Sequence, residues 1–148
     1  MRLLAAFSII IMAAVFFAVL GLNISQGAAL DVKPPYAFSA GDVASELLAL
    51  AFVFVFSVLF FGYGAPVALG IEGAKFASLY STGGVSELYL AFMLPEVLVA
   101  VSAVYLGQGL LKDYQGEGLW HRYAKNGLVF LILGLLVWAA VFFGRRFV

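Results

Sequence analysis

No charged residue interrupts the chain between Leu47 and Ile71, and the ionisable residues that follow, Glu72 and Lys75, lead into more apolar sequence. A transmembrane helix needs roughly 20 apolar residues to cross the ~30 Å hydrocarbon layer of a bilayer, and this stretch exceeds that length. The hydrophobic pattern therefore predicts a multi-pass protein of the cell membrane, surrounded mainly by lipid.

Further apolar segments on both sides predict an all-α fold, a polytopic transmembrane helix bundle that forms one domain over residues 1–148. Four segments have the length of full spans, and a shorter central segment is broken or re-entrant; if it crosses, there are five spans. The predicted segments are 3–22, 43–61, 67–81, 87–111 and 127–144, with 67–81 as the short one. The first is too long for a secretory signal, so we interpret it as a retained helix.

Two groups of helix-breaking residues flank the central segment. The sequence Gly62-Tyr63-Gly64-Ala65-Pro66 precedes it, and Ser81-Thr82-Gly83-Gly84 follows it. The segment is either a tilted crossing or a re-entrant element, and only the re-entrant form leaves both termini on one side of the membrane. Because broken backbone at membrane depth is tolerated only inside protein or beside water, we predict that 66–81 is enclosed by the other helices.

Two stretches outside the spans carry polar residues. The first loop, 23–42, contains Pro34-Pro35, which forbids a regular helix, and Ser39 with Asp42 has the spacing of a helix cap. The second stretch, 112–126, places Leu119, Trp120 and Tyr123 on one helical face. That pattern predicts a short helix lying along the membrane surface, with Trp120 and Tyr123 as interfacial residues at the headgroups.

Composition narrows the classes of function. The chain is 65% hydrophobic and 11% charged with a formal net charge of zero, so it lacks the basic surface that nucleic-acid binding requires. It contains no cysteine and one histidine, His121, so a metal site with three or four ligands is not expected, and neither is another cofactor. No nucleophile motif of the G-x-S-x-G type occurs, so we expect no enzyme activity.

Glu96 is the most informative polar residue, because it lies inside the apolar segment 87–111. A charged carboxylate within a span costs at least about 2.5 kcal/mol, and such groups usually face the protein interior. Its helical neighbours Ala100, Ala103 and Gly107 are small, which predicts a close helix-packing face. Glu96 is therefore either a proton- or cation-handling group or a protonated or ion-paired structural residue.

Glu72 and Lys75 complete the candidate intramembrane polar site. Their spacing of three residues places them on one helix face, where they can neutralise each other. A second arrangement joins Lys75 to Glu96 across two helices. Small residues at a spacing of four, typical of close helix packing, occur at three places: Ala14/Ala18, Gly73/Ala77 and Ala103/Gly107.

The order of these pieces resembles the stage II sporulation protein M family of polytopic membrane proteins. The resemblance covers the chain from about Ser45 onward and rests on three pieces: Phe61-Gly62-Tyr63-Gly64-Ala65-Pro66, then Glu72-Gly73 with Ala77, then Leu94-Pro95-Glu96-Val97 leading to Ala103 and Gly107. The chain departs from the family at four positions, where Glu96 stands for His, Val97 for Gly, Ala100 for Glu and Glu72 for Asn. Roles attached to those family positions are therefore not carried over.

The resemblance implies a non-enzymatic integral membrane protein. In spore-forming bacteria the family member anchors cell-wall-degrading partners in the membrane. By this resemblance, the expected function is that of a scaffold or subunit that associates with membrane lipids and with other membrane proteins, or with itself, through helix packing. The alternative is a small-solute, proton or ion pathway built around Glu96, Glu72 and Lys75 at a broken helix.

Overall fold

The computed structural model describes residues 1–26, 40–81 and 87–144. The described residues form five α-helices and one short 3₁₀ helix, which confirms the all-α prediction. In chain order these are α1 (Arg2–Ser25), α2 (Ala40–Leu59), α3 (Ala65–Ser81), the 3₁₀ helix η1 (Glu87–Phe92), α4 (Met93–Tyr114) and α5 (Trp120–Gly144).

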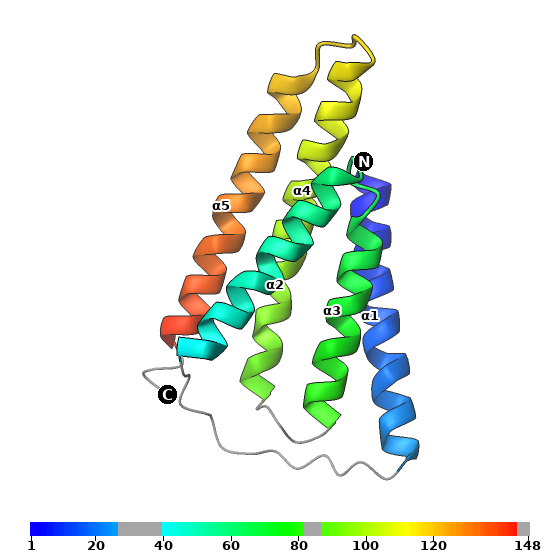
Figure 1. The fold of residues 1–148 in the computed structure, drawn as a ribbon, viewed down its shortest axis with the longest axis vertical. Coiled ribbons are helices and arrows are strands. Elements are labelled where there is room, and N and C mark those ends of the chain that lie inside the picture. Colours follow the sequence, from blue (N-terminus) through cyan, green and yellow to red (C-terminus); the bar gives the residue numbers. More distant parts are fainter. Residues whose placement is uncertain (27–39, 82–86, 145–148) are drawn as a thin grey trace.

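Successive helices run in opposite directions, so that α1 begins and α5 ends at opposite ends of the bundle (Figure 1). Helix α1 packs mainly on α3, α5 packs mainly on α4, and α2 lies against α3 and α4. The paired ends of α4 and α5 extend beyond the turn that joins α2 to α3. Helices α1 and α5 are therefore the outer helices, and α4 links the α5 side of the bundle to the α3 side.

Three helical segments are long and apolar enough to cross a membrane: Arg2–Ser25, Leu90–Tyr114 and Trp120–Gly144. The apolar part of α2, Val43–Leu59, is shorter, and so is α3. The prediction of four full spans is therefore supported for three segments only. Helix α2 ends at Leu59, before the glycine-containing turn, so the predicted segment 43–61 is helical to Leu59 only.

That turn is fixed by backbone contacts with α4. Phe61 and Gly62 both have positive φ, 53° and 89°, and the Gly62 N–H donates to the Ser57 carbonyl at 2.7 Å. The side chain of Gln108 on α4 donates to the Phe61 carbonyl at 2.7 Å. A Cβ at Gly107 would lie 2.4 Å from the Gly62 nitrogen, so only glycine permits this approach. The predicted break is thus a docked turn between two antiparallel helices.

The central segment forms one continuous helix, α3, that runs beside α1 in the same direction (Figure 1). This arrangement favours the crossing over the re-entrant form. The prediction that the segment is enclosed is wrong for one face, because Val67 and Ile71 are about half exposed. Both are apolar and suit contact with lipid, whereas Glu72 and Gly73 lie on the buried face. The helix therefore separates its polar and small residues from its lipid-compatible ones.

The predicted surface helix over 112–126 does not form. Helix α4 continues to Tyr114, and α5 starts at Trp120 and continues without interruption to Gly144. A short loop with positive φ at Gly116 and Gly118 joins them, and an ion pair between Lys112 and Glu117 spans it at 2.7 Å. The polar stretch is therefore the tip of a long helical hairpin, because the apolar pairing of α4 with α5 extends to its end.

Packing within the bundle uses small residues at the closest helix contacts. A Cβ at Gly73 would lie 2.6 Å from the Met12 carbonyl oxygen, which fixes the α1–α3 approach. A Cβ at Gly127 or Gly134 on α5 would lie 2.7 Å or 3.0 Å, respectively, from a side chain of α4. Ser102 on α4 also donates to the Gly127 carbonyl at 2.7 Å. The core formed around these contacts contains, among others, Met12, Val53, Leu69, Phe76, Phe92, Ala100 and Val104.

Several predictions fall outside the described residues. They concern Pro34-Pro35, most of the loop 23–42, the helix cap at Ser39, and the second break at 82–84.

Candidate functional site: a buried carboxyl–lysine cluster

Glu72 and Lys75 lie one turn apart on α3. The Lys75 Nζ is 2.8 Å from the Glu72 Oε2, so the predicted pairing at a spacing of three residues is confirmed. Glu72 is 5% exposed as a residue, whereas the Lys75 side chain is 30% exposed. Lys75 therefore joins a buried carboxylate to the edge of the bundle.

Glu46 on α2 is a member of the cluster that the sequence analysis did not identify. Its Oε1 lies 3.9 Å from the Lys75 Nζ, and the residue is 2% exposed. In the sequence it directly precedes the uncharged run that starts at Leu47, a position that by itself indicates a place at the membrane edge. The helical spacing of the sequence could have indicated this burial, because one stripe of α2 contains Glu46, Leu50, Val53 and Ser57. All four residues are buried.

Glu96 enters the cluster from α4. It lies in the first turn of this helix, directly after Pro95, and is 0% exposed. Pro95 is compatible with this position, because backbone N–H groups in the first turn have no partner within the helix. Neither carboxyl oxygen of Glu96 has a hydrogen-bond donor among the described residues. Glu96 thus interacts with Glu72, Lys75 and Glu46 in one buried cluster.

The Glu96 and Glu72 carboxyl groups are neighbours that can form a side-chain hydrogen bond. Two ionised carboxylates are both acceptors, so this bond requires a proton on one of them. The Glu46 charge also acts on Glu96 and is repulsive, while the Lys75 charge is attractive. The cluster therefore contains three carboxyl groups and one ammonium group from three helices, α2, α3 and α4.

The residues predicted to pack helices lie inside the bundle. Gly73, Ala77, Ala100, Ala103 and Gly107 are all buried. Gly73 contacts α1, and Gly107 contacts the turn between α2 and α3. In contrast, Ala14 and Ala18 on α1 are exposed. Of the three pairs of small residues, only this one remains available to another molecule without opening the bundle.

Within the described residues, no group of three or more His, Asp or Glu side chains has the arrangement needed to hold a metal ion. His121 is exposed at the start of α5, far along the bundle from Glu96 near the start of the antiparallel α4. Trp120 and Tyr123, the predicted interfacial residues, are half-buried and pack against Gly109 of α4.

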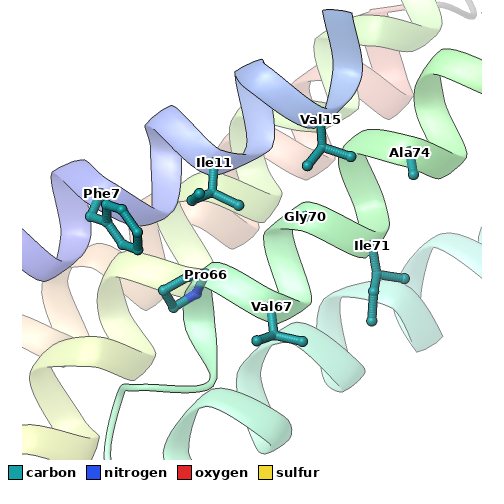
Figure 2. Close-up of a pocket in the computed structure, with 8 residues that line it drawn as sticks. All are labelled: Phe7, Ile11, Val15, Pro66, Val67, Gly70, Ile71 and Ala74. Atoms are coloured by element: carbon teal, nitrogen blue, oxygen red, sulfur yellow. The ribbon is translucent and has the colours of Figure 1, made fainter. Parts of the chain in front are cut away.

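Two apolar grooves lie on the surface of the bundle. The first, about 430 Å³, lies between α1 and α3, with Gly70 between the side chains of Ile11, Val15 and Ile71 (Figure 2). The second, about 400 Å³, lies beside the α2–α3 turn and is lined by aromatic residues that include Phe56 and Tyr63. Hydrocarbon chains suit both grooves, and neither is lined by a residue of the carboxyl–lysine cluster.

Comparison of this chain with protein-family models, with curated proteins and with solved structures found no significant match. The helical fold, with three segments suited to crossing a membrane, is therefore the basis for any functional proposal.

Proposed function

We propose that this protein is a non-enzymatic subunit or scaffold of the cell membrane, which associates with other integral membrane proteins or with itself through helix packing. The single observation that carries the proposal is the outward face of α1. Ala14, Ala18 and Gly21 form one exposed stripe at spacings of four and three residues. Nothing lies within 4 Å of the position that a Cβ at Gly21 would occupy.

The stripe lies directly opposite the buried stripe of α1. Ala5, Ser8, Met12 and Phe16 bind α1 to the bundle, and a rotation of 100° per residue places Ala14, Ala18 and Gly21 on the other side. Bulky residues such as Ile10 and Phe17 flank the small ones and are more than half exposed. Small residues between large ones allow two helix backbones to approach closely in lipid, where packing drives association.

Resemblance to the stage II sporulation protein M family supports the same proposal, because that resemblance implies a membrane anchor for partners. The proposed membership rests on the glycine-containing turn before α3 and on the order and spacing of the segments after it, which include Pro95 at the start of α4. The interior roles of Gly73, Ala103 and Gly107 direct the search for a partner to α1 instead.

A proton or ion pathway is the second candidate. The observation that favours it is the buried cluster of Glu46, Glu72, Lys75 and Glu96. Measurement of proton or ion flux in reconstituted vesicles distinguishes the two candidate functions, because a protein that acts only as a subunit or scaffold is expected to conduct no ions when it is reconstituted alone. A pH-driven flux that Glu96→Gln abolishes would favour the pathway.

Cysteine cross-linking tests the subunit proposal. Because the chain has no cysteine, each introduced cysteine is the sole thiol of the variant. Single substitutions Ala14→Cys and Ala18→Cys should form cross-links with a defined partner, or with a second copy, in native membranes. Ala13→Cys is the matched control, because Ala13 is exposed and adjacent in sequence but turned 100° away from Ala14.

Two outcomes count against the proposal. One is equal cross-linking at Ala13 and Ala14, which indicates random collisions in the lipid. The other is the absence of cross-links at every stripe position together with a monomer in mild detergent. A defined product from Ala14 and Ala18 alone supports the proposed interface.

A further inference from the structure

The buried cluster carries more negative than positive charge when all of its groups are ionised. Three glutamates and one lysine give a net charge of −2. Of the remaining ionisable groups on the outer helices, Arg2 lies at the start of α1, and His121, Arg122, Tyr123 and Lys125 lie at the start of α5. Both starts are far along the bundle from the start of α4 (Figure 1), and Glu96 lies in the first turn of α4. Neither outer helix brings a described cation to the cluster.

Within the cluster, Glu96 has the surroundings least suited to a negative charge. It is completely buried, and neither of its oxygens receives a hydrogen bond from a described donor. A buried ionised carboxylate without donors is unfavourable by several kcal/mol, so such groups usually become neutral. Lys75 is already occupied at 2.8 Å by Glu72, the closer of its two carboxylate partners.

One proton lowers the net charge of the cluster from −2 to −1 and gives Glu96 a hydrogen-bond partner. If it lies between Glu72 and Glu96, one carboxyl group donates to the other, and the pair carries a single negative charge opposite the Lys75 ammonium. Neighbouring carboxyl groups share a proton because ionising both places two like charges together. A metal ion is a poorer occupant, since the described carboxylates do not form a group that could hold one.

We infer that Glu72 and Glu96 form a proton-binding carboxyl pair within the membrane-embedded bundle, with Lys75 as its counter-ion and Glu46 as the second carboxylate of that lysine. This site goes beyond the proposed role as a subunit and does not depend on it. The pair joins α3 to α4, so the bound proton stabilises the contact between these helices. The partly exposed Lys75 lies at the outer edge of the site.

Infrared spectroscopy of the protein in lipid vesicles tests the inference directly, because protonated and ionised carboxyl groups absorb at different positions. The wild type should show a protonated carboxyl band at neutral pH that disappears only in alkaline buffer. Glu96→Gln and Glu72→Gln should each remove or shift this same band. Glu117→Gln is the matched control, since Glu117 is exposed and paired with Lys112, and it should leave the band unchanged.

The proton and a small cation predict different responses to salt. Replacing K⁺ by Na⁺ in the buffer at fixed pH should leave the band in place, and a band lost on addition of Na⁺ overturns proton binding. So does a neutral-pH spectrum with no protonated carboxyl band, or a band that persists unshifted in either Gln variant. If a Gln variant does not fold, Glu96→Asp keeps the carboxyl group and should shift the band, and an unshifted band there contradicts the inference.

Discussion

A Cβ atom at Gly73 would lie 2.6 Å from the carbonyl oxygen of Met12, closer than real Cβ atoms approach other atoms. This contact joins α3 to the backbone of α1. A carbonyl group within a helix cannot move aside as a flexible side chain could. Gly70, one turn earlier on the same helix, is different: a Cβ there would lie 3.4 Å from a methyl group of Ile11, an ordinary contact.

The two glycines therefore predict different mutational effects. Gly73→Ala should lower the thermal unfolding temperature in detergent, by an amount that corresponds to roughly 1–3 kcal/mol of overpacking. Gly70→Ala should be neutral or slightly stabilising, because alanine favours helix and the space is available. Equal unfolding temperatures for the two variants would show that the α1–α3 contact is looser than described.

Removal of the buried cation predicts a loss of stability. Lys75→Met leaves Glu46 and Glu72 buried without the Lys75 ammonium group, and breaking a buried pair in this way costs about 3 kcal/mol or more. Thermal unfolding in detergent at neutral pH measures this loss.

Lys112→Met is the control for that variant. Lys112 also pairs with a glutamate, Glu117, but at the exposed tip of the α4–α5 hairpin. Its loss should change the unfolding temperature little, because exposed ion pairs contribute little to stability. An equal loss of stability in both variants would indicate that burial of the cluster is not the cause.

The backbone conformation at the α2–α3 turn predicts that replacing a large residue there by glycine is tolerated. Phe61 has a φ of 53°, a left-handed conformation that costs a non-glycine residue roughly 1–2 kcal/mol. Phe61→Gly should therefore be close to neutral in thermal unfolding, since relief of the backbone offsets the loss of a partly exposed ring. Phe60→Gly, at a neighbouring position without positive φ, should destabilise. The reverse order would contradict this account of the turn.

Hydropathy was sufficient to predict the helical class, the break before α3 and three members of the buried cluster. Apolar runs and the rare charges within them are local properties, so Glu72, Lys75 and Glu96 are apparent from the chain alone. Glu46 was missed because its burial results from the packing of α2 on α3 and α4. Lipid-facing residues and core residues are both apolar in such a protein, so composition does not reveal which face of a helix is enclosed.

The same ambiguity explains the two incorrect predictions. The central segment was expected to be enclosed on all sides, yet Val67 and Ile71 face outward, because a helix can place its charged residues inward and its apolar ones toward lipid. The polar stretch 112–126 was expected to lie along the membrane surface. Its amphipathic pattern instead marks the tip of the α4–α5 hairpin, where Trp120 and Tyr123 pack on Gly109.

Trp120 provides a test of where that tip lies. We predict that its ring is at the headgroup level, since a half-buried tryptophan near exposed Arg122 and Lys125 has apolar and polar surroundings together. The chain has two tryptophans, so Trp138→Phe leaves a single fluorophore. Lipids with quenchers at defined depths should quench Trp120 most strongly from shallow positions. Full quenching by a water-soluble quencher, with none from lipid, would place the tip outside the membrane.

The continuous path of α3 between α2 and the far end of the bundle predicts that the two ends of the chain lie on opposite sides of the membrane. With five antiparallel helices, Leu3 at the start of α1 and Gly144 at the end of α5 lie at opposite ends (Figure 1). Single substitutions Leu3→Cys and Gly144→Cys introduce the sole thiol of each variant, because the natural chain has no cysteine. In sealed vesicles of uniform orientation, a membrane-impermeant maleimide added outside should label one variant and not the other. Both should react after the vesicles are opened with detergent, which shows that each thiol is accessible. Labelling of both variants from the same side would mean that α3 does not cross, and that one of the antiparallel helices lies within a single leaflet.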